Sequence, residues 1–417
     1  MGHKKMFRNF FLEQIMNESE IKPLFDAQFR RLQTTQLNLF RSLYPKINWQ
    51  NRLICIKGAK GTGKTTMLLQ HLKSDPEAAS KMLYVSLDKL WFASHRVEDV
   101  VDYLYTHGFT HLFLDEVHHY PDWQTVIKNI YDDYPSMQFV YSGSSLLRLE
   151  RGGGDLSRRQ REYELPGLSF REYLKFEGVG DFPSVDLPRL LSDHRAIAED
   201  IVAKVKILPY FSKYLKAGYY PFYREAGDGY LERLGRVVDQ VLEVDLPAVE
   251  NVTVSTVRKI RKMLMILAAK CPQTPKMKDL YAELETDRVK GLSMLQCLGR
   301  AGLMSLLSAE ASSLKYLSRP DKIYCDNTNL MQALVSAVDT GTSRETFFLN
   351  QLKSAGHVVT LPVKGDFKVD DTWLFEVGGE GKGFNQIKDI KDSFVANDDT
   401  EIGIGNKIPL WLFGFLY

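Results

Sequence analysis

The sequence is poor in cysteine and has no long apolar run. It contains 4 cysteines among 417 residues, and no two of them form a CxxC pair. This spacing excludes a disulfide-stapled miniprotein and predicts reduced thiols in a cytoplasmic protein. No stretch approaches roughly 18 uncharged apolar residues, so we expect no membrane-spanning helix. The first residues also lack the sustained apolar core of a secretory signal.

The chain also lacks an excess of positive or of negative residues. The chain has 54 Lys plus Arg against 52 Asp plus Glu, which gives a formal net charge of +2. The whole molecule therefore exerts no strong field on a polyanion or a membrane surface, and any contact with nucleic acid must come from a local patch. With 44% hydrophobic residues the composition is that of ordinary globular proteins, and the length suits two or three domains.

The first half of the chain alternates short apolar strands with amphipathic helices. This alternation predicts an α/β fold whose parallel sheet is covered by helices on both faces. The predicted strands are residues 52–57, 82–87, 111–114, 138–141 and 162–165, and predicted helices between them include 97–106 and 122–134.

The second half is first helical and then rich in strands. Helices are predicted over residues 187–205, 211–216 and 230–246, followed by three short helices and a hairpin between 254 and 317. The hairpin strands are expected at residues 303–307 and 314–318. Later strands are expected at residues 358–363, 372–379 and 408–417, and the last run is apolar enough to be a core strand.

A complete phosphate-binding pattern, GAKGTGKT, lies between a predicted strand and a predicted helix. Its glycines let main-chain amides turn inward around a β-phosphate at the positive end of a helix. Lys64 is expected to reach the β- and γ-phosphates, and Thr65 to ligate Mg²⁺. We therefore predict that ATP and Mg²⁺ bind at Gly58, Ala59, Lys60, Gly61, Thr62, Gly63, Lys64, Thr65 and Thr66.

Two carboxylates, Asp115 and Glu116, end the apolar strand HLFL. Asp115 is expected to hold the metal ion through water, and Glu116 to orient and deprotonate the attacking water. The letters DEVH also spell the DExH box of helicases, but no second nucleotide-binding core follows residue 170. We therefore expect His118 and His119 to begin a surface loop.

Polar and basic residues follow the next strand, QFVY. Ser142 or Ser144 either contacts the γ-phosphate or the attacking water, or belongs to a plain strand-to-helix turn. The basic segment after them either supplies an arginine finger to a neighbouring subunit's nucleotide or is a solvated loop. Its arginines are Arg148, Arg151, Arg158, Arg159 and Arg161.

The chain resembles the bacterial and archaeal AAA-type ATPases of the extended AAA family. The resemblance covers nearly the whole chain and is carried by IKGAKGTGKTTML, YVSLD, FLDEVHHYPDWQTVIKNIYD, FVYSGSSLL, LSRRQREYELPGLSFREYL and FSKYLKAGYYP. It implies Walker A roles for Lys64 and Thr65 and Walker B roles for Asp115 and Glu116. It also implies a sensor role for one of the two serines, Ser142 or Ser144, and matches Arg159 to the arginine of the family's GR pair, although Arg158 replaces the glycine.

The same resemblance implies a winged-helix segment over residues 254–326. Winged helices often place their last helix in a DNA major groove. Here that helix, residues 289–303, offers only Lys290 and Arg300 as cations. DNA binding, packing within the chain and a protein partner are the alternatives for this segment.

The C-terminal region is similar to the PD-(D/E)XK nuclease fold, whose carboxylates bind Mg²⁺ to activate water. An intact motif has a lysine two residues after its second acid, but that position is Gly378 here, and the nearest lysine is Lys382. Either this lysine reaches in from the next turn, or the scaffold is degenerate. The residues that follow the order of the motif are Glu345, Asp366, Glu376 and Gln386, and with Lys382 they form a tentative second site.

Together these inferences predict four domains: an ATPase core (1–177), a helical lid (178–253), a winged-helix domain (254–330) and a PD-(D/E)XK-like domain (331–417). The main hypothesis is a cytoplasmic ATPase that uses hydrolysis to reorient its C-terminal domains, with DNA, a protein partner or self-association as possible partners. One alternative is an ATP-dependent nuclease or DNA-processing factor. Another is a nucleotide-dependent switch that binds a protein partner and turns over little.

Overall fold

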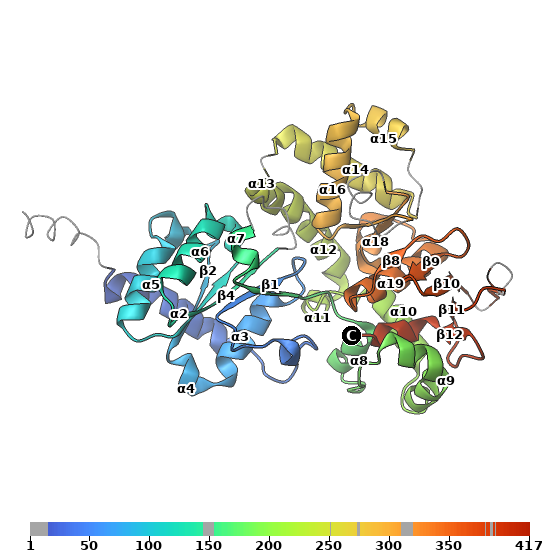
Figure 1. The fold of residues 1–417 in the computed structure, drawn as a ribbon, viewed down its shortest axis with the longest axis horizontal. Coiled ribbons are helices and arrows are strands. Elements are labelled where there is room, and N and C mark those ends of the chain that lie inside the picture. Colours follow the sequence, from blue (N-terminus) through green and yellow to red (C-terminus); the bar gives the residue numbers. More distant parts are fainter. Residues whose placement is uncertain are drawn as a thin grey trace, which may run out of the picture. The chain divides into compact units, whose positions relative to one another are not determined.

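The computed structural model describes residues 16–144, 154–250, 252–272, 276–309, 320–379, 381–383, 387 and 389–417 (Figure 1). The chain forms two compact units. The first runs to Gly58 and then from Gly63 to Leu165, and the second comprises Ala59–Thr62 and Pro166–Tyr417. Within the described ranges, none of the helices has the length and apolarity needed to span a membrane.

The first unit is built on a five-stranded sheet with the order β2-β3-β4-β1-β5. All neighbouring strands are parallel, so their carboxyl ends lie at one edge of the sheet. The predicted parallel α/β core is therefore confirmed. The strands are β1 (Leu53–Lys57), β2 (Met82–Ser86), β3 (His111–Asp115), β4 (Gln138–Gly143) and β5 (Arg161–Glu164).

Both faces of this sheet are buried because successive side chains of a strand point to opposite faces. Leu53 and Cys55 of β1 pack in a cluster that includes residues of α2, α5 and α6, whereas Ile54 and Ile56 pack with α3. Each fully buried aliphatic side chain contributes roughly 1.5–3 kcal/mol. The covering helices, seen in Figure 1, are α2 (Glu18–Thr34), α3 (Lys64–Ser74), α5 (Val97–Thr106) and α6 (Trp123–Asp133).

The second unit begins with a run of helices, the first of which has a capping box. The Ser169 hydroxyl accepts a hydrogen bond from Glu172 N (3.1 Å), and the Glu172 carboxylate accepts one from Ser169 N (3.1 Å), which satisfies two backbone donors at the helix start. The helices are α8 (Phe170–Phe176), α9 (Leu187–Val202), α10 (Ile207–Lys216), α11 (Tyr223–Ala226), α12 (Tyr230–Gln240), the π-helical turn η6 (Val241–Asp245) and α13 (Leu246–Val249).

Asn329, on α18 (Thr328–Leu334), joins several of these helices through its buried side chain. Its Oδ1 accepts hydrogen bonds from Gly218 N and Tyr219 N (both 2.9 Å) and from the Tyr230 hydroxyl (2.6 Å). Its Nδ2 donates to the Tyr214 carbonyl (3.0 Å). One amide thus satisfies two main-chain donors at the end of α10 that would otherwise be buried without partners.

The three predicted helices and the first predicted hairpin strand follow: α14 (Val254–Ala269), α15 (Met277–Glu283), α16 (Arg288–Arg300) and β6 (Met304–Leu307). The antiparallel partner of β6 is β7 (Lys322–Cys325). The predicted second strand at 314–318 lies outside the described residues. The expected pairing of 303–307 with 314–318 therefore stays a prediction, and the partner that the structure describes for β6 is β7.

The last part of the second unit is a mixed sheet with the order β12-β11-β10-β9-β8. Strands β10, β11 and β12 are parallel, and β8, β9 and β10 are antiparallel. Phe348 of α19 (Thr340–Ser354) packs on this sheet, with its ring centroid 5.4 Å from Phe367 and 5.0 Å from Phe375. The strands are β8 (Val359–Thr360), β9 (Phe367–Val369), β10 (Trp373–Gly378), β11 (Ser393–Asn397) and β12 (Lys407–Pro409).

The final apolar run is not the predicted strand. Strand β12 ends at Pro409, and the chain continues as the 3-10 helix η7 (Leu410–Phe415), whose residues are all buried. Proline cannot donate to a sheet ladder, and a run that is apolar at every position does not distinguish a buried strand from a buried helix. The expectation that this segment belongs to the core is correct.

Candidate nucleotide-binding site

The loop of residues 58–63 joins β1 to α3 and depends on two glycines in left-handed conformations. Gly61 has a φ of 88° and Gly63, which caps α3, a φ of 97°. A side chain would strain the backbone at both positions. The turn is closed by hydrogen bonds from Thr62 N to the Ala59 carbonyl (3.3 Å) and from Met67 N to the Gly63 carbonyl (3.0 Å). The positive end of α3 therefore starts directly at the loop.

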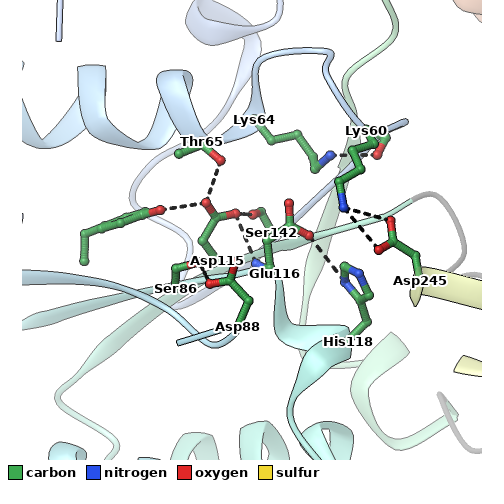
Figure 2. A network of polar contacts seen from close by, with 12 residues as sticks. Lys60, Lys64, Thr65, Ser86, Asp88, Asp115, Glu116, His118, Ser142 and Asp245 are labelled. Carbon is green, nitrogen blue, oxygen red and sulfur yellow. Dashed lines mark hydrogen bonds and ion pairs between the residues drawn. The ribbon is translucent and has the colours of Figure 1, made fainter. Parts of the chain in front are cut away.

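Lys64 is the first residue of α3, and its side chain lies along the loop (Figure 2). Its Nζ donates a hydrogen bond to the Gly58 carbonyl (2.8 Å), and the residue is buried. Burying an ammonium group costs free energy unless nearby polar groups accept its hydrogen bonds. The loop thus holds one cation beside its own main-chain amides, a combination suited to a polyanion.

Thr65 and Asp115 meet at the carboxyl edge of the sheet. The Thr65 hydroxyl donates to Asp115 Oδ2 (2.6 Å), and Glu116 N donates to Asp115 Oδ1 (3.1 Å) (Figure 2). Asp115 is buried at the end of β3. The structure therefore brings together the two oxygen-bearing side chains predicted to hold Mg²⁺, a cation that prefers such ligands.

Two further hydroxyl groups contact Asp115. Ser142, on β4, donates to Asp115 Oδ1, and Tyr84, on β2, donates to Asp115 Oδ2 (2.7 Å). Burial, followed by the charge of Asp115, raises the pKa of the Tyr84 phenol well above its ordinary value. Ser142 thus lies against the carboxylate, while Ser144 is buried just beyond the strand.

Tyr84 was not predicted as a site residue. It lies on the strand beside β3, two residues before Ser86, which is opposite Asp115 in the ladder. The same phenol oxygen accepts a hydrogen bond from Arg31 of α2 (2.6 Å), and the Arg31 guanidinium lies 5.3 Å from the ring centroid. The segment YVSLD contains this tyrosine, but only knowledge of the strand order places it next to Asp115.

Glu116 has a left-handed backbone, with φ 54° and ψ 43°. This conformation is uncommon outside glycine and recurs at functional sites. His118 Nδ1 lies 3.6 Å from Glu116 Oε2 (Figure 2). The expectation that His118 begins a surface loop is wrong: the residue is 3% exposed and belongs to the 3-10 turn η3 (Val117–His119), because Val117 and His118 turn inward after the strand. Together with His119, these side chains offer ligand atoms within 4.8 Å of one another.

Of the predicted arginines, Arg159 has a defined ion pair. Its Nε lies 3.0 Å from Asp132 Oδ1 on α6, and a second guanidinium nitrogen lies 3.1 Å from Oδ2. This two-point pairing holds the side chain against its own unit. Arg158 and Arg161 are exposed, and Arg148 and Arg151 lie outside the described residues.

Lys60, at the tip of the loop, is paired within the second unit. Its Nζ lies 3.1 and 3.3 Å from the two carboxylate oxygens of Asp245, which is buried in η6 (Figure 2). The sequence pattern gives no specific role to this position of the loop. Its partner, 185 residues further along the chain, could not be inferred from the sequence.

The tentative second site is also brought together, in the C-terminal part of the second unit. Lys382 Nζ lies 2.6 Å from Glu376 Oε2 and 3.9 Å from Asp366 Oδ2. Glu345, on α19, raises the pKa of Asp366 through its charge, after burial as the main cause. Gln386 lies outside the described residues.

Residues 50–174 match a family model described as an AAA domain. An uncharacterised protein of Methanocaldococcus jannaschii is 27% identical over 298 residues, which are 66% of this chain and 61% of that protein. The alignment thus spans less than two thirds of the relative's length. The chain therefore contains a P-loop core of the AAA type, which indicates nucleotide binding.

Two solved structures show a remote likeness. The ORC1 protein of Aeropyrum pernix in complex with DNA is 15% identical over 74% of this chain and 91% of that chain, with a TM-score of 0.32. The AMPPCP-bound DnaA of Aquifex aeolicus is 17% identical over 68% of this chain and 89% of that chain, with a TM-score of 0.26.

Proposed function

We propose that this chain is a cytoplasmic ATPase that binds ATP with Mg²⁺ at residues 58–66 and hydrolyses it. The observation that carries the proposal is the contact of Thr65 with Asp115 (2.6 Å) at the end of the loop that holds Lys64. A glycine-rich turn, a buried ammonium group and a hydroxyl–carboxylate pair supply what a triphosphate and its cation need. Titration with ATP in the presence of Mg²⁺, together with measured phosphate release, tests the proposal directly.

In this proposal the loop binds and positions the nucleotide. The main-chain amides around Gly61 and Gly63 face the β-phosphate, and Lys64 exchanges the Gly58 carbonyl for phosphate oxygens. Thr65 and Asp115 would hold Mg²⁺, which would neutralise charge on the phosphates. Positioning and electrostatic stabilisation of this kind supply most of the rate in phosphoryl transfer.

Glu116 is the proposed general base. Its side chain is 20% exposed, so water can reach it, and the main chain holds it directly after the metal-binding Asp115. The carboxylate would orient a water molecule and take its proton as the bond to the γ-phosphorus forms. His118 Nδ1 lies 3.6 Å from this carboxylate and so limits where Glu116 can point.

Hydrolysis is proposed to reorient the helical, winged-helix and C-terminal segments. DNA, a protein partner and a second copy of the chain remain candidate partners, and phosphate release with and without duplex DNA separates the first from the others.

A finger role for Arg159 would require its pair with Asp132 to open. A nucleotide-dependent switch differs from an ATPase by binding ATP with negligible phosphate release.

A second candidate function is the hydrolysis of a phosphodiester bond by the C-terminal site. The observation that favours it is that Asp366, Glu376 and Lys382 lie together although the sequence places them on separate segments. Cleavage of DNA that requires Mg²⁺, is lost in Asp366→Ala and persists in Lys64→Ala would support it.

A further inference from the structure

A group of metal-ligating side chains lies directly after the strand that carries Asp115. Glu116, His118 and His119 each offer one ligand atom, and these atoms all lie within 4.8 Å of one another. The carboxylate of Glu116 faces the His118 ring, with Oε2 and Nδ1 3.6 Å apart (Figure 2). Two ligand atoms of one tetrahedral Zn²⁺ ion are separated by roughly 3.4 Å. Glu116 and His118 are therefore already spaced to share an ion.

The third ligand, His119, lies beside the second. The rings of His118 and His119 have centroids 4.3 Å apart and planes inclined at 37°. The separations in the group exceed the tetrahedral spacing by no more than about 1.5 Å. Rotation of the half-buried His119 ring about its side-chain bonds covers such a distance.

The turn that carries these side chains is fixed by the main chain and by the core. His119 N donates a hydrogen bond to the Glu116 carbonyl (3.1 Å), and Tyr120 N donates to the Val117 carbonyl (3.0 Å). Val117, between the ligands, is fully buried in the hydrophobic core of the first unit. The three ligands thus come from one anchored turn, and no distant segment has to move for them to meet.

The ligand types separate this group from the proposed magnesium site. Thr65 and Asp115 offer oxygen atoms, which suit Mg²⁺, whereas imidazole nitrogens suit Zn²⁺, Co²⁺ and similar transition metals. Two histidines and one carboxylate occur together in zinc sites that keep a fourth position for water. The Glu116 side chain is 20% exposed and that of His118 is fully buried, so a hydrated ion can enter on the side of Glu116.

We propose that Glu116, His118 and His119 bind a transition-metal ion such as Zn²⁺, and that the bound ion inhibits ATP hydrolysis. A carboxylate oxygen that ligates the ion has its lone pair engaged by the metal, so Glu116 cannot take the proton of the attacking water. The inhibition rests on the proposed role of Glu116 as general base, whereas the metal site itself does not. Free Zn²⁺ would then set how much of the protein is able to turn over.

Titration of the full-length chain with Co²⁺ tests the site, because Zn²⁺ has a filled d shell and gives no visible absorption. A large excess of Mg²⁺ keeps the oxygen ligands of the magnesium site occupied. The parent should develop the visible bands of Co²⁺ bound by nitrogen ligands, and added Zn²⁺ should remove them.

His119→Gln is the informative variant, since an exchange at the buried His118 would also disturb the core. It should lower the Co²⁺ affinity about a hundredfold or more, because even residues that only support a metal ligand contribute 10–100-fold. His107→Gln, at an exposed histidine, is the matched control and should bind Co²⁺ as the parent does. Equal Co²⁺ affinity in the parent and His119→Gln would overturn the proposal.

Phosphate release from MgATP, measured with Zn²⁺ and with a chelator, tests the inhibition. Zn²⁺ at a concentration that fills the site should slow release about tenfold or more in the parent and in His107→Gln. In His119→Gln the same Zn²⁺ concentration should leave the rate close to that variant's own rate in chelator. Unslowed release in the Zn²⁺-loaded parent, or equal slowing in the parent and His119→Gln, would overturn the inhibition. A parent that binds Co²⁺ but releases no phosphate in chelator would reject the proposed ATPase and leave the metal site standing.

Discussion

The phenol of Tyr84 donates a hydrogen bond to Asp115 Oδ2 over 2.7 Å, and Arg31 donates to the same phenol oxygen over 2.6 Å. Helix α2 is thereby linked through one tyrosine to the carboxylate proposed to hold Mg²⁺. The linkage is contained within the first unit. Tyr84 is a positioning residue, since its contact is with the carboxylate.

Tyr84→Phe should raise the Mg²⁺ concentration needed for half-maximal phosphate release about tenfold. The variant keeps the ring but loses a hydrogen bond to a charged group, a contribution of roughly 1.5–3 kcal/mol, part of which is expressed as poorer placement of Asp115. ATP affinity measured without Mg²⁺ should be unchanged. Tyr105→Phe, at an exposed tyrosine, is the matched control. An unaltered Mg²⁺ dependence would remove Tyr84 from the site.

Lys64→Ala should weaken ATP binding by about a hundredfold or more, because the buried ammonium group beside the loop amides is lost. Isothermal titration with a non-hydrolysable ATP analogue measures this. Lys22→Ala, at an exposed lysine of α2, should bind as the parent does. Retained affinity in Lys64→Ala would contradict the proposed site.

Glu116→Gln should bind ATP normally yet release phosphate at least about a hundredfold more slowly, since general-base catalysis typically contributes 10²–10⁴-fold. Single-turnover measurements separate this effect from product release. Glu18→Gln, at an exposed position of α2, serves as the comparison. Normal phosphate release in Glu116→Gln would show that Glu116 is not the general base.

Asn329→Leu should destabilise the second unit by about 3 kcal/mol or more. The substitution leaves the main-chain amides of Gly218 and Tyr219 buried without an acceptor, and each such group costs roughly 1–3 kcal/mol. Urea unfolding gives the difference. Gln240→Leu, at an exposed site on α12, should change stability by less than about 0.5 kcal/mol.

His71 predicts a pH dependence of stability in the first unit. Its ring stacks on Trp49 with centroids 3.8 Å apart, and burial, with a smaller contribution from the charge of His111, lowers its pKa from 6.5 to about 4. Between these values the unfolded chain binds a proton that the folded chain does not, so this contribution to the free energy of unfolding falls as the pH falls.

Urea midpoints measured across this pH range check the prediction. His71→Gln should lose less stability than the parent between neutral pH and about pH 4. His107→Gln, at an exposed histidine, is the control and should follow the parent. The same acid dependence in the parent and His71→Gln would mean that other groups account for it.

The positions of the first five strands along the chain and the phosphate loop could be predicted from the sequence, because both are marked by local patterns. Hydrophobic runs mark the strands, and the parallel arrangement places the ends of β1 and β3 at one edge. The proximity of Thr65 and Asp115 follows from that rule. Several helices of the second unit, such as α9, α12 and α14, were also predictable, since their apolar residues recur at helical spacing.

Contacts that depend on pairing between distant segments could not be predicted. Tyr84 meets Asp115 only because β2 is next to β3, and Asn329 satisfies amides more than a hundred residues earlier. The pairing of β6 with β7 was not predicted, because a short apolar run on either side of a turn is an equally good strand. The prediction of a strand at the end of the chain was wrong for a related reason. A run that is apolar at every position shows neither the period of a strand nor that of a helix.

The position of Lys382, which contacts Glu376 from four residues beyond Gly378, has a consequence for finding such sites in other sequences. A lysine can reach the same point in space from a different position in the sequence. Sequence motifs with a fixed spacing will then classify an intact site as a degenerate one. In domains rejected on that criterion, a small residue where the charge is missing and a basic residue just downstream would mark a site whose charged groups still meet in space.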